Sequence, residues 1–260
     1  MFSVLVAYFL LLVSDATVVL DVNTTVGEST VLPCNLAVPA TIGLRNLRFS
    51  WQDERKYVLY SFNKGMERPE YVNGLYRGRV TAFPQDMIGG NISVTLQNIT
   101  LEDNQKVFQA YAAVLDSGGT GGYILRLREI CQITLHVAVA YERINLAVNE
   151  DTRTAVCTHR GFPKPLLTWR LQNLSDPQHF LDARDVHTTA VQDPQDHLYS
   201  LRSTVDISGG PYRSVTCLIH NPTLNVTLNT THILNKGEAE RSLPGRTAVL
   251  ILAAVVLNLS

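Results

Sequence analysis

The sequence predicts an all-β protein made of two sandwich domains in tandem. Short stretches rich in Val, Ile, Leu, Thr and Tyr alternate apolar and polar residues, and clusters of Gly, Pro, Asn and Asp separate them about every ten residues. No helical period persists for more than about two turns. The chain has 260 residues, which is room for two domains of ordinary size.

The second half carries the clearer signature. Cys157 and Cys217 lie about 60 residues apart, and Trp169 follows Cys157 by about a dozen residues. This is the spacing of an inter-sheet disulfide between strands B and F, with the strand-C tryptophan packed on it, in the immunoglobulin fold. Val215 stands where that fold usually has a tyrosine. We expect a constant-type immunoglobulin-like domain over residues 142–235.

The first half begins like a variable-type domain, expected over residues 17–138. Cys34 ends a predicted strand B, and Trp51 lies in a predicted strand C. Leu47 and Phe49 share the parity of Trp51, so all three should face the core. The residues between and after them should lie on the outer face: Arg48, Ser50 and Gln52.

Strand F of this domain lacks the expected cysteine. Asp103 opens the turn into the strand, but a register with one inserted residue fits the apolar pattern best and places Ala110 where the cysteine would be. This register buries apolar groups and exposes the polar glutamine. Phe108, Ala112 and Val114 then face inward, and Val107, Gln109 and Tyr111 face outward.

The fourth cysteine, Cys131, lies on a long predicted strand G. It shares parity with Ile133, Leu135 and Val137, so it should point into the same core. We therefore expect a Cys34–Cys131 bridge, which requires Cα atoms within about 7 Å of each other. The alternatives are two free thiols, or one thiol that links two chains.

The two ends indicate export and attachment. Residues 1–16 are apolar, too short to span a bilayer, and end in small residues, as in a signal peptide. A buried N-terminal strand is the alternative. A polar stalk over residues 236–246 precedes a hydrophobic tail, residues 247–260, with an apolar run of roughly 13 residues against the about 20 that a membrane-spanning helix needs. The tail fits either a lipid-anchor signal or a truncated transmembrane helix.

Six glycosylation sequons agree with export. Their acceptor residues are Asn23, Asn91, Asn98, Asn173, Asn225 and Asn229. An oxidising compartment also favours disulfides over metal binding for the four cysteines.

Composition argues against nucleic acid and catalysis. Charged residues make up 17% of the chain and the net charge is −1, which provides no basic field for a polyanion. The seven histidines are scattered without metal-ligand spacing. His187 follows Asp182 and Asp185, but no nucleophile motif accompanies them, so we expect a solvated loop and not a proton relay. We expect no enzyme, no cofactor and no metal.

With these residues placed, the chain resembles the B7 family of T-cell costimulatory ligands, in particular its inducible-costimulator-ligand and CD80-type members. The resemblance covers residues 18–235. The short segments that carry it are Trp51–Leu59, Tyr76–Arg79, Thr134–Ala138, Gly161–Pro165 and Gln192–Tyr199.

The resemblance implies a plasma-membrane protein, exposed outside the cell or secreted, that binds a costimulatory or co-inhibitory receptor on T cells. The outer face of the first domain would bind that receptor. Carried over residue by residue, this face would include Arg48, Ser50, Gln52, Tyr57, Tyr60, Phe62 and Tyr111. A weak homodimer is a further expected assembly. The alternative functions are those of an adhesion protein, a butyrophilin-like regulator or a soluble decoy, because the fold does not fix the function.

Overall fold

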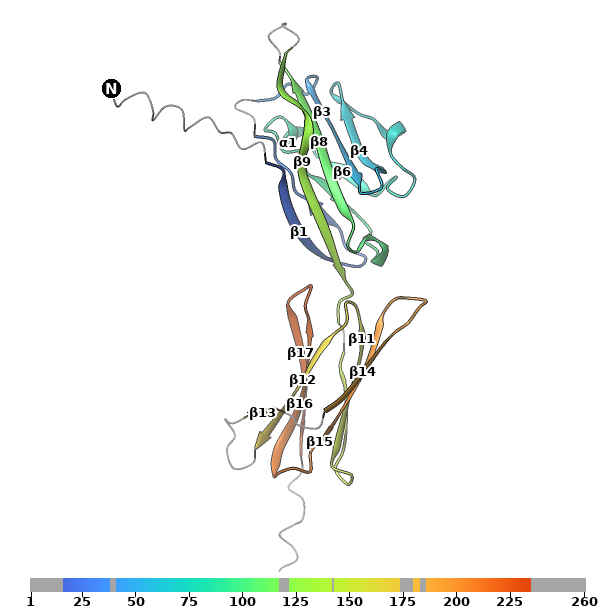
Figure 1. The fold of residues 1–260 in the computed structure, drawn as a ribbon, viewed down its shortest axis with the longest axis vertical. Helices are drawn as coiled ribbons and strands as arrows, with labels where there is room; N and C mark the ends of the chain where they lie inside the picture. Colours follow the sequence, from blue (N-terminus) through green and yellow to red (C-terminus); the bar gives the residue numbers. More distant parts are fainter. Residues whose placement is uncertain are drawn as a thin grey trace, which may run out of the picture.

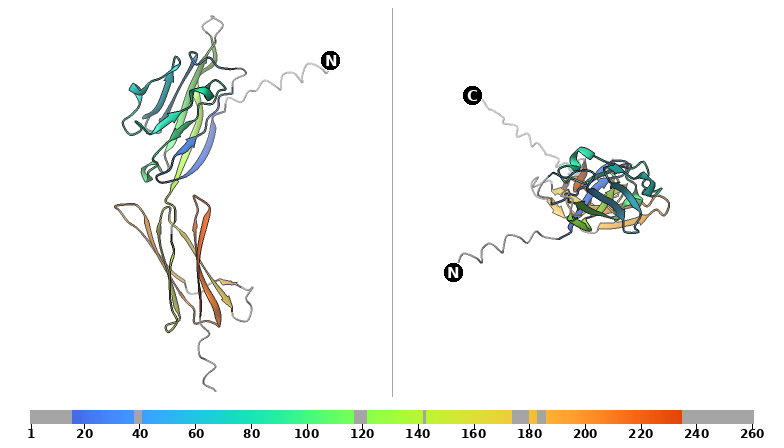
Figure 2. Two further views of the ribbon diagram at one scale, coloured as in Figure 1. Left: turned by 180° about the vertical axis from the view of Figure 1, so that it is seen from behind. Right: turned by 90° about the horizontal axis from the view of Figure 1, so that it is seen from above.

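The computed structural model describes residues 16–37, 41–116, 122–141, 143–173, 180–182 and 186–234. The predicted signal peptide, apart from its last residue, and the predicted stalk and hydrophobic tail lie outside these ranges. Two β-sandwiches follow one another along the long axis of the molecule (Figures 1 and 2). This is the tandem immunoglobulin-like fold that the sequence predicts.

The first sandwich packs a six-stranded sheet, in the order β1-β9-β8-β3-β4-β5, against a three-stranded sheet, β2-β7-β6. Strand β1 runs parallel to β9, and the other neighbours in both sheets are antiparallel. The elements are β1 (Val18–Thr25), β2 (Thr30–Leu32), β3 (Leu47–Asp53), β4 (Val58–Asn63), β5 (Met66–Glu67), η1 (Pro69–Tyr71), β6 (Val80–Ala82), α1 (Pro84–Met87), β7 (Val94–Leu96), η2 (Leu101–Asp103), β8 (Val107–Leu115) and β9 (Tyr123–Ala138).

Trp51 lies at the centre of the first core. Its side chain is fully buried, and its Nε1 donates a hydrogen bond to the carbonyl oxygen of Ile92 at 2.9 Å, across to the other sheet. Leu47 and Phe49 are buried beside it, as the alternation predicts. Burial of these three side chains gives strand β3 its fixed register, because a slip by one residue would expose all of them.

A disulfide joins Cys34 to Cys131, with the two Cα atoms 5.9 Å apart. Ala110 on β8 is the cross-strand partner of both Cys131 and Trp51. In the second domain the corresponding partner of Trp169 is Cys217. Ala110 therefore occupies the strand-F cysteine position, and the sulfur that reaches Cys34 comes from the neighbouring strand.

The second sandwich packs the sheet β10-β11-β15-β14 against the sheet β13-β12-β16-β17. Cys157 and Cys217 form a disulfide across it, and Trp169 donates from Nε1 to Ser203 Oγ at 2.9 Å. The strands are β10 (Asn145–Asn149), β11 (Thr154–Gly161), β12 (Leu166–Asn173), β13 (Phe180–Asp182), β14 (Val186–Gln192), β15 (Tyr199–Asp206), β16 (Tyr212–Asn221) and β17 (Val226–Ile233).

His187 corrects one expectation. It lies on strand β14, paired with Thr204, and not in a loop. Its side chain is exposed. The prediction failed because the strand is exposed on both faces apart from the half-buried Ala190, so it lacks the alternation by which a half-buried strand is recognised.

The linker between the domains docks on the second sandwich. Val139 donates its backbone N–H to the Phe162 carbonyl oxygen at 2.8 Å, and the Tyr141 hydroxyl donates to the Pro163 carbonyl oxygen at 3.0 Å. The Tyr141 ring meets the His159 ring edge-on, with 4.4 Å between centroids. The linker is thus held by the loop between β11 and β12.

Candidate functional site

The outer face of the first domain is formed by the solvent-facing side of strands β9, β8, β3 and β4. Arg48 is exposed, and its cross-strand neighbours are Asn63 and Ala113. Ser50 lies between Ser61 and Tyr111 in the same way. These residues take the positions that the parity of Trp51 predicts.

A network of polar side chains lies at the centre of this face, and we call it the polar network: Lys56, Gln109, Tyr111 and Glu129. Lys56 Nζ donates to Gln109 Oε1 at 3.1 Å, and Gln109 Nε2 donates to Glu129 Oε2 at 3.0 Å. The Tyr111 hydroxyl donates to the same carboxylate oxygen at 2.9 Å. Lys56 Nζ also lies 5.7 Å from the centroid of the Tyr111 ring, within the range of a cation–π contact. The network holds an aromatic ring and a carboxylate in defined positions on a half-exposed surface.

The turn that carries Lys56 is shaped by a buried carboxylate. Asp53 Oδ1 accepts the backbone N–H groups of Arg55 at 3.0 Å and Tyr57 at 2.8 Å. Asp53 Oδ2 accepts the Tyr76 hydroxyl at 2.8 Å. Burial, followed by this hydrogen bond, raises the pKa of Tyr76, so the phenol remains a donor. Asp53 thus ties the turn to the core below it.

Tyr60 and Phe62 correct the sequence-based face. Their side chains are only 4% and 2% exposed. Phe49 packs against both rings, with centroid distances of 5.6 Å. Tyr60 pairs with Trp51 and Phe62 pairs with Phe49, so both point into the core with their inward-facing partners. Their assignment to the outer face was wrong.

The pairing of β4 with β3 explains the error. The pairing with β3 shifts between Trp51 and Gln52, so that Val58 is opposite Gln52 and Tyr60 is opposite Trp51. Tyr60 and Phe62 lie in regular register on the Phe49 side of this shift, opposite inward-facing residues. Their even-numbered parity differs from that of Tyr57, so alternation along one strand does not place all three on one face. Tyr57, just before the strand, stays exposed.

Glu129 was missed for a related reason. It shares odd-numbered parity with the inward-facing Cys131, so simple alternation would place it in the core. A second register shift, where Ala110 pairs with Cys131 but Tyr111 pairs with Glu129, turns the carboxylate outward. The sequence does carry a signal for this bulge: Glu129 is a charged residue at a position whose parity is otherwise that of apolar, inward-facing residues.

The sequons lie outside the four strands of the outer face, although Asn23 is on β1 of the same sheet. Asn23 lies on β1 opposite His136, while Asn91 and Asn98 lie on either side of β7 in the other sheet. None of the strands β3, β4, β8 and β9 contains a sequon. Asn173, Asn225 and Asn229 belong to the second domain.

Known proteins are similar to this chain, and a family model matches its second domain. A family model of the CD80-like C2-set immunoglobulin domain matches residues 140–227. Mouse T-lymphocyte activation antigen CD86 is 25% identical over 232 residues, which cover 86% of this chain and 70% of that protein. Human ICOS ligand is 26% identical over 216 residues, which cover 80% of this chain and 67% of that protein.

The chain is a B7-like protein of the immunoglobulin superfamily. A solved structure supports the same relationship over both domains. A chain in the crystal structure of ICOS in complex with ICOS-L and an anti-ICOS-L VNAR domain is similar to this B7-like protein, with a TM-score of 0.58 and 25% identity. The match covers 84% of this chain and all of that one.

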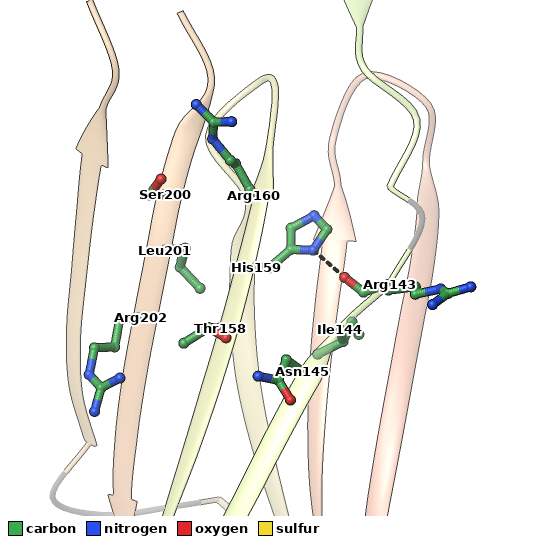
Figure 3. A pocket seen from close by; sticks show the side chains of 9 residues that line it. All are labelled: Arg143, Ile144, Asn145, Thr158, His159, Arg160, Ser200, Leu201 and Arg202. Carbon is green, nitrogen blue, oxygen red and sulfur yellow. Dashed lines mark hydrogen bonds between the residues drawn. The ribbon is translucent and has the colours of Figure 1, made fainter. Parts of the chain in front are cut away.

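The second domain of this B7-like protein has a shallow basin of about 690 Å³ on strands β10, β11 and β15. His159 lines it and donates from Nδ1 to the Arg143 carbonyl oxygen at 2.8 Å (Figure 3). The guanidinium groups of Arg143, Arg160 and Arg202 point in different directions (Figure 3), and Arg160 is paired with two aspartates. Because these cations do not converge, the basin is a weaker candidate than the outer face.

The described residues contain neither a cluster of metal ligands nor a membrane-spanning helix. Within these ranges, His, Cys, Asp and Glu form no group of three or more that could hold a metal ion. No helix there is long and apolar enough to cross a membrane.

Proposed function

We propose that this B7-like protein is a cell-surface ligand that binds a costimulatory or co-inhibitory receptor on T cells and so regulates T-cell activation. The observation that carries the proposal is the polar network at the centre of an outer face whose strands contain no sequon. A half-exposed tyrosine suits an interface because it presents a large area with little rotamer freedom to lose and has a polar tip. The names of the relatives, an activation antigen of T lymphocytes and the ligand of ICOS, support a receptor of this class.

Receptor binding to the full chain tests the proposal. The chain would be produced in mammalian cells and captured through a tag inserted after Ala16. Purified ectodomains of T-cell costimulatory-family receptors are then passed over it. We expect at least one to bind, and we expect Tyr111→Ala and Glu129→Ala to weaken it about tenfold, or about 1.4 kcal/mol each.

A matched control separates the face from general damage. Val31 is exposed on β2, in the opposite sheet, so Val31→Ala should leave the affinity unchanged. If a receptor binds but neither change on the outer face weakens it, the proposed face is wrong. If no receptor of this class binds, the proposed function is wrong.

We further propose that the protein acts on the external face of the plasma membrane, attached by a lipid anchor that replaces the tail, and that it forms a weak homodimer. Phosphatidylinositol-specific phospholipase should release it from cells. Retention after this treatment would favour a membrane-spanning helix. Sedimentation of the purified chain over a concentration series measures the homodimer.

A further inference from the structure

Three segments meet at the end of the first domain farthest from the linker and form an apolar groove, which we call the apical groove. Its lining residues are Leu44, Arg45, Lys64, Gly65, Met66 and Leu115. They come from the segment before β3, the β4–β5 turn and the end of β8, and the groove has a volume of about 800 Å³.

Backbone contacts fix the three segments against one another. Leu115 donates its N–H to the Asn46 carbonyl oxygen at 3.0 Å, which joins β8 to the segment before β3. Gly65 has a φ of +81°, and a Cβ there would lie 3.5 Å from Arg45 Cγ. The β4–β5 turn therefore packs directly on Arg45. The relative positions of the groove's walls are therefore fixed, because each wall adjoins the end of a strand.

The groove exposes apolar side chains that the described residues of the domain leave accessible. Leu115 is 42% exposed and Met66 is 58% exposed, whereas Leu44 packs against the core below them. Tyr123, the cross-strand partner of Leu115, is also exposed and continues the apolar surface onto β9. Clustered apolar groups of this kind mark interaction sites more often than single exposed residues do.

Two cations border this apolar surface without counter-charges. Arg45 and Lys64 are exposed, and neither has a hydrogen bond or an ion pair within the described part of the chain. By contrast, Lys56, Arg79, Lys106 and Arg160 all have side-chain partners. A partner that carries a carboxylate would supply the missing charge, and the apolar surface would accept an aliphatic or aromatic side chain.

The apical groove is continuous with the outer face. Asn63, next to Lys64 in the chain, pairs with Arg48 on the outer face, and Arg48 pairs in turn with Ala113. A protein seated on the polar network can therefore reach the groove with a neighbouring loop.

We propose that the apical groove is a second contact site for the receptor, and that it takes a receptor loop in which an Asp or Glu lies beside a large apolar residue. This inference rests on the proposed function and specifies the partner chemistry at its edge. The apolar side chain would enter between Met66 and Leu115, and the carboxylate would lie between Arg45 and Lys64.

The test uses the tagged full chain and whichever receptor ectodomain binds it. Leu115→Ser and Met66→Ser should each weaken binding about tenfold, since truncated apolar anchors lose that much affinity. Lys64→Glu should lower the association rate constant. The difference from the unchanged chain should shrink as the salt concentration rises from about 50 to about 300 mM, because salt screens the interaction between exposed charges. Changing the receptor's acidic residues to Lys, one at a time, should restore affinity to the Lys64→Glu chain at one position.

Matched controls come from the second domain. Val191 on β14 and Lys164 are exposed, so Val191→Ser and Lys164→Glu should leave binding unchanged. Unchanged thermal midpoints for all these variants show that the fold is intact.

The outcomes separate this inference from the proposed function. If Tyr111→Ala weakens binding but the apical variants do not, the apical inference is wrong and the proposed function stands. If the apical variants instead abolish self-association of the chain without changing receptor binding, a second copy occupies the groove and the inference is wrong. If no receptor binds, both fail.

Discussion

Tyr60 shows how one side chain can look like a contact residue and act as a core residue. Its ring is stacked on Phe49, while its hydroxyl donates to Glu67 Oε1 at 2.7 Å at the edge of the sheet. Burial of the ring, followed by this hydrogen bond, raises the pKa of Tyr60. The residue therefore links the core to β5 and has no free surface for a partner.

We predict that Tyr60→Phe lowers the free energy of unfolding by about 1 kcal/mol, the net worth of one hydrogen bond, and leaves receptor affinity unchanged. The matched change on the outer face is Tyr111→Phe, which removes the hydroxyl bonded to Glu129 and should weaken binding. Chemical denaturation and receptor titration measure the two effects. A loss of affinity in Tyr60→Phe equal to that in Tyr111→Phe would contradict the burial of Tyr60.

At the scale of elements, two strands of the first domain provide what strand β16 provides alone in the second. Strand β16 carries both the disulfide cysteine and the residue opposite the core tryptophan, whereas in the first domain the cysteine lies on β9 and the residue opposite the tryptophan lies on β8. Ala110 and Cys131 are cross-strand partners and both are buried. The bridge from Cys34 to β9 joins residues separated by 97 positions, and on chain-entropy grounds a disulfide across a loop of that length stabilises the domain by about 4.7 kcal/mol.

We predict that Cys131→Ala lowers the thermal midpoint of the first domain, and that adding Ala110→Cys restores most of the loss by forming a bridge between Cys34 and the new thiol on β8. The reason is that Ala110 stands opposite Trp51 as Cys217 stands opposite Trp169. Mass spectrometry of peptides from the non-reduced chain identifies the bridge. The control adds Ala110→Ser to Cys131→Ala, and equal midpoints for the two double variants would show that the new thiol does not pair.

At the scale of the whole molecule, the linker between the domains packs against a buried histidine, His159. His159 is 7% exposed, and its Nε2 has no partner in the described part of the chain. Burial lowers the pKa of His159 from 6.5, and the hydrogen bond to the Arg143 carbonyl oxygen only partly opposes this. The folded protein therefore holds His159 neutral, against the Tyr141 ring of the linker.

We predict that the second domain loses stability as the pH falls below about 6.5. The unfolded chain takes up a proton there that the folded chain does not, so protonation favours unfolding until the lowered pKa of the folded state is reached. Protection factors of β11 amides, from hydrogen exchange at pH 7.5 and 5.5, measure this. His159→Gln should flatten the pH dependence, and an unchanged slope in that variant would assign the effect to another group.

The fold class and most strands followed from the sequence, because the alternation of apolar residues and the Cys157–Trp169–Cys217 spacing are local patterns. For the same reason Arg48, Ser50, Gln52 and Tyr111 could be assigned to the outer side of the sheet. Tyr60 and Phe62 were misplaced because their orientation follows from the pairing that sets them opposite Trp51 and Phe49. Glu129 was missed because its orientation depends on a register shift between β8 and β9.

The sequence by itself therefore determined two immunoglobulin-like sandwiches, their core tryptophans and the parity of strands β3 and β8. Only the tertiary structure decided which side chains meet in the polar network and that Arg45, Lys64, Met66 and Leu115 surround one groove. The physical reason is that alternation along one strand is a property of that strand, whereas a bulge and a meeting of loops are properties of strands that pair across the chain.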